Sequence, residues 1–204
     1  MSTMGKVVPV AALAAVALYW FYARAGGRPA VVLPAPAVDA PRAVAASAEP
    51  QTVVLAGGCF WGVEAVFKHV KGVTEATSGY AGGSADTAQY ELVSDGNTGH
   101  AESVRVMFDP AQVSFETLVR KFYEIHDPTQ LNRQGPDEGT QYRTAIFYHS
   151  PQQKEAAERV TAELNKARFK GRIVTQITPA QTFWRAEEYH QKYGQKHPGH
   201  HCTL

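Results

Sequence analysis

The sequence predicts an α+β domain, built as a two-layer sandwich in which helices cover one face of a mixed β-sheet. Stretches typical of strands alternate with stretches typical of helices in the order β-α-β, β-α-β and α-β, which indicates a split β-α-β arrangement. Short apolar or alternating runs indicate strands, and apolar residues at i, i+3, i+4 and i+7 indicate helices. The chain of 204 residues has room for one such domain with appended segments.

The first strand and helix are joined by a glycine turn that carries a cysteine. Residues 53–56 form an apolar run that is long enough for a buried strand but too short for a helix. Gly57 and Gly58 interrupt this run, and apolar residues at positions 63, 66, 67 and 70 then have the spacing of one helix face. Cys59 is therefore expected where the helix begins.

Two interpretations of Cys59 are open from this pattern. A helix N-terminus carries unsatisfied N–H groups and a partial positive charge, which stabilise a thiolate and lower the pKa of a cysteine placed there. Phe60 and Trp61 would then build an apolar wall beside a nucleophilic sulfur. The alternative is an inert core residue, since free cysteine is among the most buried residue types. The coincidence of strand, glycine turn and helix start favours the nucleophile.

The next elements follow from local patterns. Residues 72–83 carry one strand and end in a glycine pair, and residues 90–95 form a short helical turn. Residues 102–109 alternate apolar and polar side chains, which is typical of a strand. Ser114 is expected to cap the next helix, whose buried stripe consists of Phe115, Leu118, Val119 and Phe122.

The C-terminal half begins with a long loop. Residues 127–141 are polar and interrupted by glycine and proline, and a loop of that length in a compact domain tends to be functional. Ser150 is expected to cap a helix that starts at Pro151 and runs to about Phe169. The other expected elements are a strand at 144–149, a strand at 173–177, a short helix at 187–193 and an irregular tail.

The N-terminal part has a different composition. Residues 7–23 contain no charge, lie between Lys6 and Arg24, and are just long enough to span a membrane. We therefore expect residues 1–25 to be a signal peptide or an N-terminal membrane anchor, followed by an Ala/Pro-rich linker at 26–51. The folded domain is expected at 52–204, exported or membrane-anchored on the periplasmic side, and monomeric.

Charge and cysteine content exclude some classes of function. A formal net charge of +1 gives no indication of a nucleic-acid partner. The chain has 2 cysteines and no Cys-x-x-Cys, so a zinc site of the usual spacing is not expected. A group of residues near the C-terminus could bind a metal, but its irregular spacing makes such binding incidental; it consists of His190, His197, His200, His201 and Cys202.

Cys202 also has two interpretations. Two cysteines in an exported chain could form one disulfide that staples the fold. Cys202 lies in an irregular tail after Pro198 and Gly199, however, and a cysteine in a flexible tail is better suited to attack a sulfenic acid. Together with an activated Cys59, this favours a two-step redox cycle over a structural bridge.

Three motifs give the chain a resemblance to a known family. GCFWG at 58–62, GHAE at 99–102 and QGPDEGTQYR at 134–143 resemble the peptide methionine sulfoxide reductases of the A type. The resemblance covers about residues 53–202, and three separate motifs in order are specific. It implies a ferredoxin-like two-layer sandwich, in agreement with the pattern of elements. It also implies reduction of methionine-S-sulfoxide, in proteins and free, as a repair of oxidative damage.

The resemblance implies a role for each matching residue in the reaction. Cys59 matches the nucleophile that attacks the sulfoxide sulfur, and Glu102 matches the carboxyl that protonates the sulfoxide oxygen. Tyr90 and Tyr142 match the hydroxyl groups that hold this oxygen. Cys202 matches the resolving cysteine, whose disulfide with the nucleophile is opened by a thioredoxin-like reductant. No metal, flavin or nucleotide cofactor is implied.

Further residues match the walls of the site. Phe60 and Trp61 match the aromatic pocket around the S-methyl group, and Asp137 matches a polar group that lines the site. His190 is expected at the edge of this pocket. Chemistry explains the acid: a sulfoxide oxygen leaves only when protonated, and burial raises the pKa of a carboxyl above its usual value of about 4.3, so that it keeps its proton.

Alternatives to the reductase are a cysteine hydrolase and a metal-binding module. The hydrolase would use Cys59 with a histidine such as His100 or His126 as its base, and it would leave Cys202 without a role. The metal-binding module would use the histidines of the tail. Glu102 taken alone is also compatible with a surface carboxylate at the start of a strand.

Overall fold

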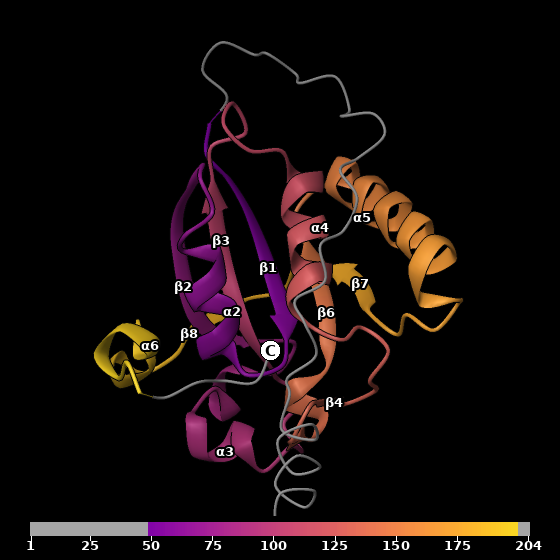
Figure 1. The fold of residues 1–204 in the computed structure, drawn as a ribbon. Helices are drawn as coiled ribbons and strands as arrows, with labels where there is room; N and C mark the ends of the chain where they lie inside the picture. The colour runs from indigo at the N-terminus through magenta and orange to yellow at the C-terminus, as the bar shows by residue number, and fades with distance from the viewer. Residues whose placement is uncertain (1–48, 200–204) are drawn as a thin grey trace, which may run out of the picture. The chain divides into compact units, whose positions relative to one another are not determined.

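The computed structural model describes residues 49–199, which form a six-stranded mixed sheet and the helices packed on it (Figure 1). The strand order is β7-β6-β1-β3-β2-β8. Strands β6 and β7 pair in parallel and the other neighbours pair antiparallel. The prediction of an α+β fold with a mixed sheet is therefore confirmed. The bounds are β1 (Gln51–Gly57), β2 (Val73–Ala81), β3 (Ala101–Phe108), β6 (Thr144–Tyr148), β7 (Gln176–Pro179) and β8 (Phe183–Arg185).

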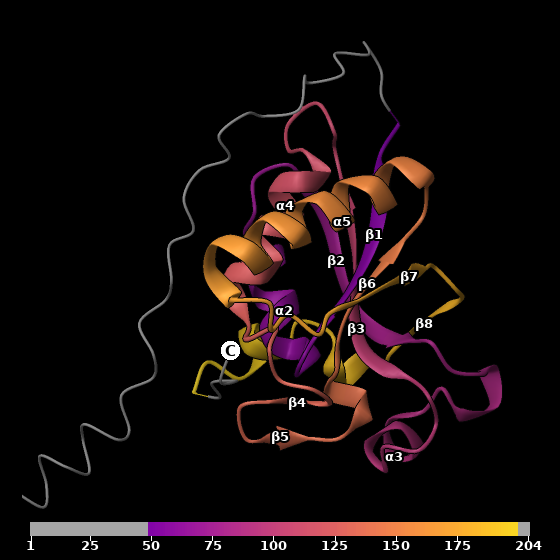
Figure 2. The same cartoon turned by 90° about the vertical axis from the view of Figure 1, so that its right-hand side faces the viewer.

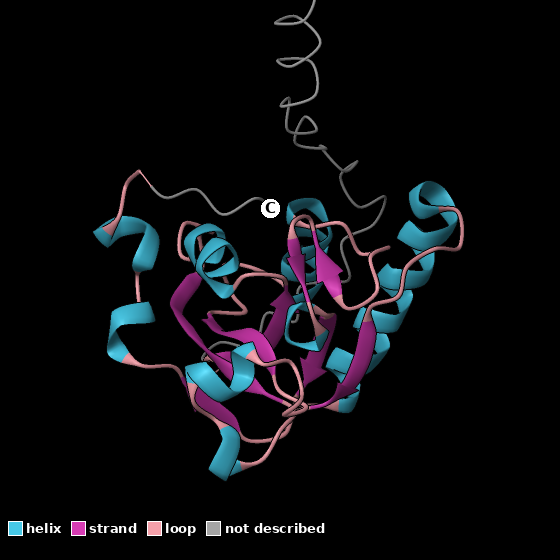
Figure 3. Ribbon diagram, turned by 90° about the horizontal axis from the view of Figure 1, so that it is seen from below, coloured by secondary structure: helices cyan, strands magenta, loops and turns pink. Residues whose placement is uncertain are grey.

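Three of the helices lie together on one side of the sheet (Figures 2 and 3). These are α2 (Phe60–Phe67), α4 (Phe115–Ile125) and α5 (Pro151–Leu164). The short helices are α3 (Tyr90–Ser94) and α6 (Tyr193–Lys196), with 3-10 turns at Ala85–Thr87, Thr140–Tyr142 and Glu188–His190. A small hairpin of β4 (Arg133–Gln134) and β5 (Asp137–Glu138) lies within the long loop.

Strand β1 is buried on both of its faces. Val53 and Leu55 belong to the main core, together with side chains of α2, α4 and α5. Val54 and Ala56 belong to a second cluster on the opposite face of the sheet, with Ala81, Ala101, Ala145 and Phe147. A strand covered on both faces is apolar throughout rather than alternating, which explains the uninterrupted run at 53–56.

Local signals located the helix starts correctly. The Ser114 hydroxyl accepts the Thr117 N–H at 3.1 Å, and the Ser150 hydroxyl accepts the Gln153 N–H at 3.2 Å. Both serines are the predicted caps of α4 and α5. The strands at 72–83 and 102–109 and the short helix at 90–95 are also present, as β2, β3 and α3.

The C-terminal elements differ from the prediction. Residues 173–175 lie outside β7, because the N–H groups of Ile173 and Val174 already bond to Asn165 Oδ1 and the Pro128 carbonyl. The helix expected at 187–193 is two separate turns, since Lys192 between them adopts φ +57°. The last turn of the helix expected to end near Phe169 is π-helical. Strand β8, which pairs with the edge of β2, was not predicted.

Several predictions lie wholly or partly outside the described residues. They are the leader at 1–25, nearly all of the linker at 26–51, and Cys202 with His200 and His201. Gln51, the last residue assigned to the linker, is the first residue of β1 and pairs with Phe108. Along 49–199, the structure contains no helix with both the length and the apolar character needed to cross a membrane.

Candidate active site

Cys59 occupies the turn between β1 and α2 and is the N-cap residue of the helix, with φ −55° and ψ 120°. Its carbonyl accepts the Gly62 N–H at 3.2 Å, which starts the helical hydrogen-bond pattern. The side chain is half-buried. The predicted position at the helix start is therefore confirmed, and the electrostatic field of the helix end favours a thiolate there.

The long loop packs directly onto the turn that carries Cys59. Gly58 has φ +93°, and a Cβ at this position would lie 2.6 Å from Gln134 Cγ. The buried Gln134 amide accepts the Asp127 N–H and donates to the Asp127 carbonyl, which fastens the side chain within the loop. Asp137 is paired with Gln134 in the β4–β5 hairpin, so the hairpin is held close to the cysteine turn.

Glu102 lies next to Cys59 through a backbone contact. It is the second residue of β3 and shares the helix-covered face of the sheet with Val104 and Val106. Its side chain is buried, at 3% exposure, and its Oε2 accepts the backbone N–H of Phe60 at 3.0 Å. The carboxyl group is therefore held at the N-terminus of α2, one residue beyond Cys59, and is not the surface carboxylate of the alternative interpretation.

Tyr90 and Tyr142 come from α3 and from the 3-10 turn Thr140–Tyr142. Burial raises the pKa of both phenols, and the charges of Glu102 and Cys59 raise it further. For Tyr142 the Asp137 carboxylate contributes as well. Both groups therefore lie within the electrostatic field of the predicted acid and nucleophile, and both remain hydrogen-bond donors at neutral pH.

Asp137 lies in the loop near these groups, in β5. Burial raises the pKa of its carboxyl group. Its charge is also one of the causes that raise the pKa of Tyr142. The loop at 127–141 thus carries Asp137 and packs through Gln134 on the glycine before Cys59, and its functional role stays a prediction.

Aromatic rings surround the start of α2. The Phe60 ring is buried and its centroid lies 5.9 Å from that of Tyr80. The Trp61 indole stacks on Tyr193 with centroids 3.7 Å apart and planes at 7°. The His190 imidazole, which is 1% exposed, lies 5.0 Å from the Phe60 centroid and accepts the Trp61 Nε1–H at 3.0 Å.

Glu187 is a site residue that the sequence pattern did not indicate. Its Oε2 accepts the Tyr80 hydroxyl at 2.8 Å, and its Oε1 accepts the backbone N–H of Tyr90 at 3.0 Å. Burial opposes the charge of this carboxyl, but the hydrogen bonds outweigh it and lower its pKa. Glu187 thus fixes the start of α3 to β2. Its partners lie 107 and 97 positions away, so no local spacing could have identified it.

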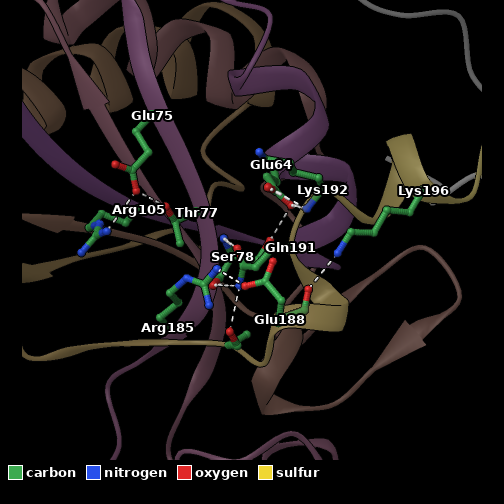
Figure 4. Close-up of polar contacts among 11 residues, drawn as sticks. Glu64, Glu75, Thr77, Ser78, Arg105, Arg185, Glu188, Gln191, Lys192 and Lys196 are labelled. Carbon is green, nitrogen blue, oxygen red and sulfur yellow. Dashed lines mark hydrogen bonds and ion pairs between the residues drawn. The ribbon is translucent and has the colours of Figure 1, made fainter.

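The segment that carries Glu187 and His190 is anchored by buried polar contacts (Figure 4). The Gln191 side chain accepts the Ser78 N–H at 3.1 Å and donates to the Ser78 carbonyl at 2.9 Å. Glu64 of α2 is 1% exposed and accepts both the Ser78 hydroxyl and the Lys192 N–H. These bonds tie residues 191–192 to β2 and α2.

The histidines of the hydrolase alternative are both engaged in structural contacts. His100 accepts the Gly83 N–H through Nδ1, and its Nε2 contacts the Ser84 carbonyl at 2.9 Å. His126 contacts the Phe122 carbonyl through Nδ1 and the Thr144 hydroxyl through Nε2. Because each ring uses both nitrogens, neither offers a free base to Cys59, and the geometry gives no support to the hydrolase.

The metal-binding alternative depends on residues at the end of the chain. Among residues 49–199, no group of three or more His, Cys, Asp and Glu side chains is arranged to hold a metal ion. Of the five residues proposed for this site, His200, His201 and Cys202 lie outside the described range.

Comparison with known proteins identifies the family. Residues 51–204 match the family described as Peptide methionine sulfoxide reductase. The chain is 55% identical over 143 residues to the peptide methionine sulfoxide reductase MsrA of Acidobacterium capsulatum, a match that covers 68% of this chain and 90% of that protein.

Solved structures agree with this match. Mxr1 from Saccharomyces cerevisiae in reduced form superposes with a TM-score of 0.72 at 34% identity, covering 76% of this chain and 89% of that one. Mxr1 in complex with Trx2 superposes with a TM-score of 0.51 at 26% identity, covering 71% and 84%. The chain belongs to the peptide methionine sulfoxide reductase family.

Proposed function

We propose that this protein is a thioredoxin-dependent peptide-methionine (S)-S-oxide reductase, which acts on methionine-S-sulfoxide in proteins and on the free amino acid. Membership of the family supports the reaction. The observation that carries the assignment to this site is the hydrogen bond from the Phe60 N–H to Glu102, which brings a buried carboxyl to the helix end where Cys59 lies. A nucleophile and an acid are the two groups that sulfoxide reduction requires.

In the proposed first step, the Cys59 thiolate attacks the sulfoxide sulfur while Glu102 donates its proton to the sulfoxide oxygen. The sulfoxide S–O bond and the transient bond between the two sulfurs then break while an S–OH bond forms on Cys59, which gives methionine and a sulfenic acid on Cys59. Tyr90 and Tyr142 donate hydrogen bonds to the oxygen and stabilise the charge that develops on it, as an oxyanion hole does. Their raised pKa values keep them in the donor form.

In the second step, the Cys202 thiol attacks the sulfenic sulfur, which releases water and forms the Cys59–Cys202 disulfide. A thioredoxin-like dithiol then reduces this disulfide, so that one dithiol is oxidised for each sulfoxide reduced. The Mxr1 complex with Trx2 supports a donor of this kind. The cycle uses no metal, flavin or nucleotide cofactor on this chain.

The aromatic cluster supplies a binding surface for the substrate. Phe60 and Trp61 follow Cys59 directly, and we assign them to the pocket for the S-methyl group. Asp137, delivered by the loop hairpin, provides a polar group at the same site. His190 belongs to this cluster through its contacts with both pocket rings.

For the N-terminal segment we retain the proposal from the sequence. Residues 1–25 would act as a signal peptide or membrane anchor and would place a monomeric domain on the periplasmic side, on a linker at 26–51. Cell fractionation of a C-terminally tagged full chain tests this. Recovery with the membrane or periplasmic fraction supports it, and recovery with cytosolic proteins would contradict it.

The function is tested by supplying each methionine sulfoxide epimer separately to the full chain with thioredoxin, thioredoxin reductase and NADPH. The proposal predicts NADPH oxidation with the S epimer only. Cys59→Ser should abolish it, because serine cannot take the oxygen atom through a sulfenic acid. Equal turnover of the two epimers, or none of either, would contradict the proposal.

A further inference from the structure

We propose that Gln141 is a positioning residue that joins the two segments carrying the phenols, and that it thereby sets the distance between the Tyr90 and Tyr142 hydroxyl groups. This inference rests on the proposed function, in which both hydroxyl groups donate to one sulfoxide oxygen. It assigns Gln141 a role through the two tyrosines and requires no contact between the amide and the substrate.

The Gln141 side chain connects the two elements that carry the phenols. It belongs to the 3-10 turn Thr140–Tyr142, and its Nε2 donates to the Ser94 carbonyl at 3.0 Å. Ser94 is the last residue of α3, whose first residue is Tyr90. Since a carbonyl can only accept, the nitrogen of the amide faces Ser94 and the oxygen points away from it. One hydrogen bond thus links two segments whose bonded residues are 47 positions apart in the chain.

Helix α3 passes the position of its last residue on to its first. The helix has 5 residues, and the Ser94 hydroxyl donates to the Tyr90 carbonyl at 2.7 Å. The Tyr90 N–H is held in turn by Glu187 Oε1 at 3.0 Å. With its start fixed by Glu187, the helix has its direction set by the bond at Ser94, and this direction places the Tyr90 ring.

The Gln141 bond is shielded from water, whereas a parallel bond is not. Gln141 is 4% exposed, so water has little access to either partner of its bond with Ser94. The Thr140 hydroxyl donates to the Gly96 carbonyl at 2.5 Å, but Thr140 is exposed and water competes for this contact. The position of α3 relative to the 3-10 turn therefore depends mainly on Gln141.

The Gln141 amide is enclosed by two glycines. A Cβ at Gly139 would lie 2.1 Å from Gln141 Oε1, and a Cβ at Gly96 would lie 3.0 Å from it. This oxygen is buried and accepts no hydrogen bond from any residue in the range 49–199. An unpaired buried acceptor costs free energy that an apolar side chain would not. A glutamine at this position is thus explained by the bond that its nitrogen makes and not by packing.

The distance between the phenols matters because two donors can stabilise one oxygen only if both lie within hydrogen-bond distance of it. An O–H donor prefers a separation of about 2.7–2.8 Å from its acceptor. A misplacement of about 1 Å can cost about 10²-fold in rate. Since the charge on the oxygen develops in the transition state, the loss falls on the rate of methionine formation and not on substrate binding.

The test measures methionine formation in single turnovers of the full chain with the S epimer of N-acetylmethionine sulfoxide. Gln141→Met keeps an unbranched side chain of similar length but removes the donor. Gln153→Met is the matched control, because Gln153 is 5% exposed and its Nε2 also donates to a backbone carbonyl, that of Thr52, at 3.0 Å. This second bond joins α5 to the start of β1, at the end of the sheet opposite to α3 (Figure 1).

We expect Gln141→Met to slow methionine formation by about 10- to 100-fold and to keep the half-saturating substrate concentration within about threefold of the wild type. Gln153→Met should keep the wild-type rate within about threefold, even where its thermal unfolding midpoint falls. A wild-type rate in Gln141→Met would overturn the inference, as would an equal fall in rate in the two variants.

A double-mutant cycle separates positioning from a general loss of structure. In Tyr142→Phe the hydroxyl group that Gln141 positions is absent, so the addition of Gln141→Met should change the rate by no more than about twofold. The same 10- to 100-fold loss, roughly, in both backgrounds would overturn the inference. If the wild type forms no methionine, or if Tyr142→Phe keeps the wild-type rate, the proposed function itself is wrong at this point.

Thr140 tests the same link if Gln141→Met fails to fold. Thr140→Val removes the bond to the Gly96 carbonyl, and Thr140→Ser retains it. We expect methionine formation to be slower in the valine variant than in the serine variant by about threefold or more. Equal rates in these two variants would overturn the inference.

Discussion

The backbone N–H of Phe60 donates a hydrogen bond to Glu102 Oε2 at 3.0 Å, although the two residues are 42 positions apart. This bond joins the N-terminus of α2 to the start of β3. Since Phe60 directly follows Cys59, the proposed nucleophile and the proposed acid are held by adjacent parts of one hydrogen-bonded unit. Their relative position is therefore set by secondary structure and not by flexible side chains alone.

The first prediction concerns the proton of Glu102. Glu102→Gln keeps an oxygen that can accept the Phe60 N–H but has no acidic proton. General acid catalysis typically contributes about 10²- to 10⁴-fold, so we expect methionine formation to slow by that factor. The thermal unfolding midpoint should change little. A variant that retains the wild-type rate within a factor of about three would show that Glu102 does not donate the proton.

The second prediction concerns the glycine before Cys59. Gly58 has φ +93°, and its added Cβ would lie 2.6 Å from Gln134 Cγ; Gly171 has φ +78° but nothing within 4 Å of such a Cβ. Gly171→Ala should therefore lower the free energy of unfolding only through backbone strain, by about 1 kcal/mol. Gly58→Ala should lower the free energy of unfolding by a further 1–3 kcal/mol, roughly, because the added methyl group overpacks the contact with Gln134. It should also lower activity, because the loop is displaced from the turn that carries Cys59.

Urea unfolding of the two glycine variants measures this difference. Gly171→Ala is the matched control, since it introduces the same methyl group at a similar backbone angle in open space. Equal free energies of unfolding for the two variants would mean that the packing of Gln134 on the turn adds nothing to stability.

The third prediction concerns Arg143, which follows Tyr142. Its guanidinium group donates at 2.8–3.0 Å to three backbone carbonyls, those of Gly99, His100 and Thr140. It thus joins the 3-10 turn that carries Tyr142 to the chain just before Glu102. Arg143→Met should lower the free energy of unfolding by at least about 2 kcal/mol, since even one hydrogen bond from a charged donor is typically worth about 1.5–3 kcal/mol.

Activity provides a second measurement on Arg143. Arg143→Met should reduce kcat because Tyr142 and the start of β3 lose their connection. The kcat of Arg143→Lys should lie between those of the methionine variant and the wild type, because an ammonium group cannot reproduce the planar fork of the guanidinium group. If Arg143→Met lowers stability but leaves kcat unchanged, the contact is purely structural.

The elements that the sequence predicted correctly carry a recognisable signal within their own residues. The caps at Ser114 and Ser150 bond to N–H groups three residues away, and the run at 53–56 is apolar because β1 is covered on both faces. Strand β8 has no such local signal, since its pairing with β2 joins Tyr80 to Trp184. The left-handed turn at Lys192 likewise depends on a bond to Glu64, 128 positions away.

The site was predictable to different degrees. The position of Cys59 at a helix start follows from the strand, glycine and helix pattern alone. Glu102, Tyr90, Tyr142 and Asp137 were assigned only through the resemblance, because they come from separate elements that the fold brings together. Neither the local sequence pattern nor the resemblance indicates Glu187, since its role is visible only in its bonds to Tyr80 and Tyr90.

The fourth prediction concerns pH and His126. The Phe122 carbonyl can only accept, so His126 Nδ1 donates to it and Nε2 accepts the Thr144 hydroxyl. Burial lowers the pKa of this ring to about 4. An unfolded histidine titrates near 6.5, so the unfolded state binds more protons between these values, and stability falls as the pH decreases from about 6.5 to 4.

The expected slope from His126 is about 1.4 kcal/mol per pH unit, with a total of about 3 kcal/mol. His126→Gln can keep both hydrogen bonds but cannot titrate, so it should remove this slope. The free energy of unfolding of the two proteins, measured from pH 4 to 7.5, gives the difference directly. Parallel curves for the wild type and the variant would show that His126 is not kept neutral by the fold.

The most direct measurement is a single turnover of the full chain with a mixture of methionine sulfoxide epimers and no added reductant, followed by mass spectrometry of the product and of both cysteines. We expect about one methionine per chain, from the S epimer only, together with a new Cys59–Cys202 disulfide. In Cys202→Ser we expect the same methionine and a sulfenic acid on Cys59. Methionine formed while Cys59 remains unmodified, or no methionine from either epimer, would contradict the assignment of Cys59 as the group that takes the oxygen.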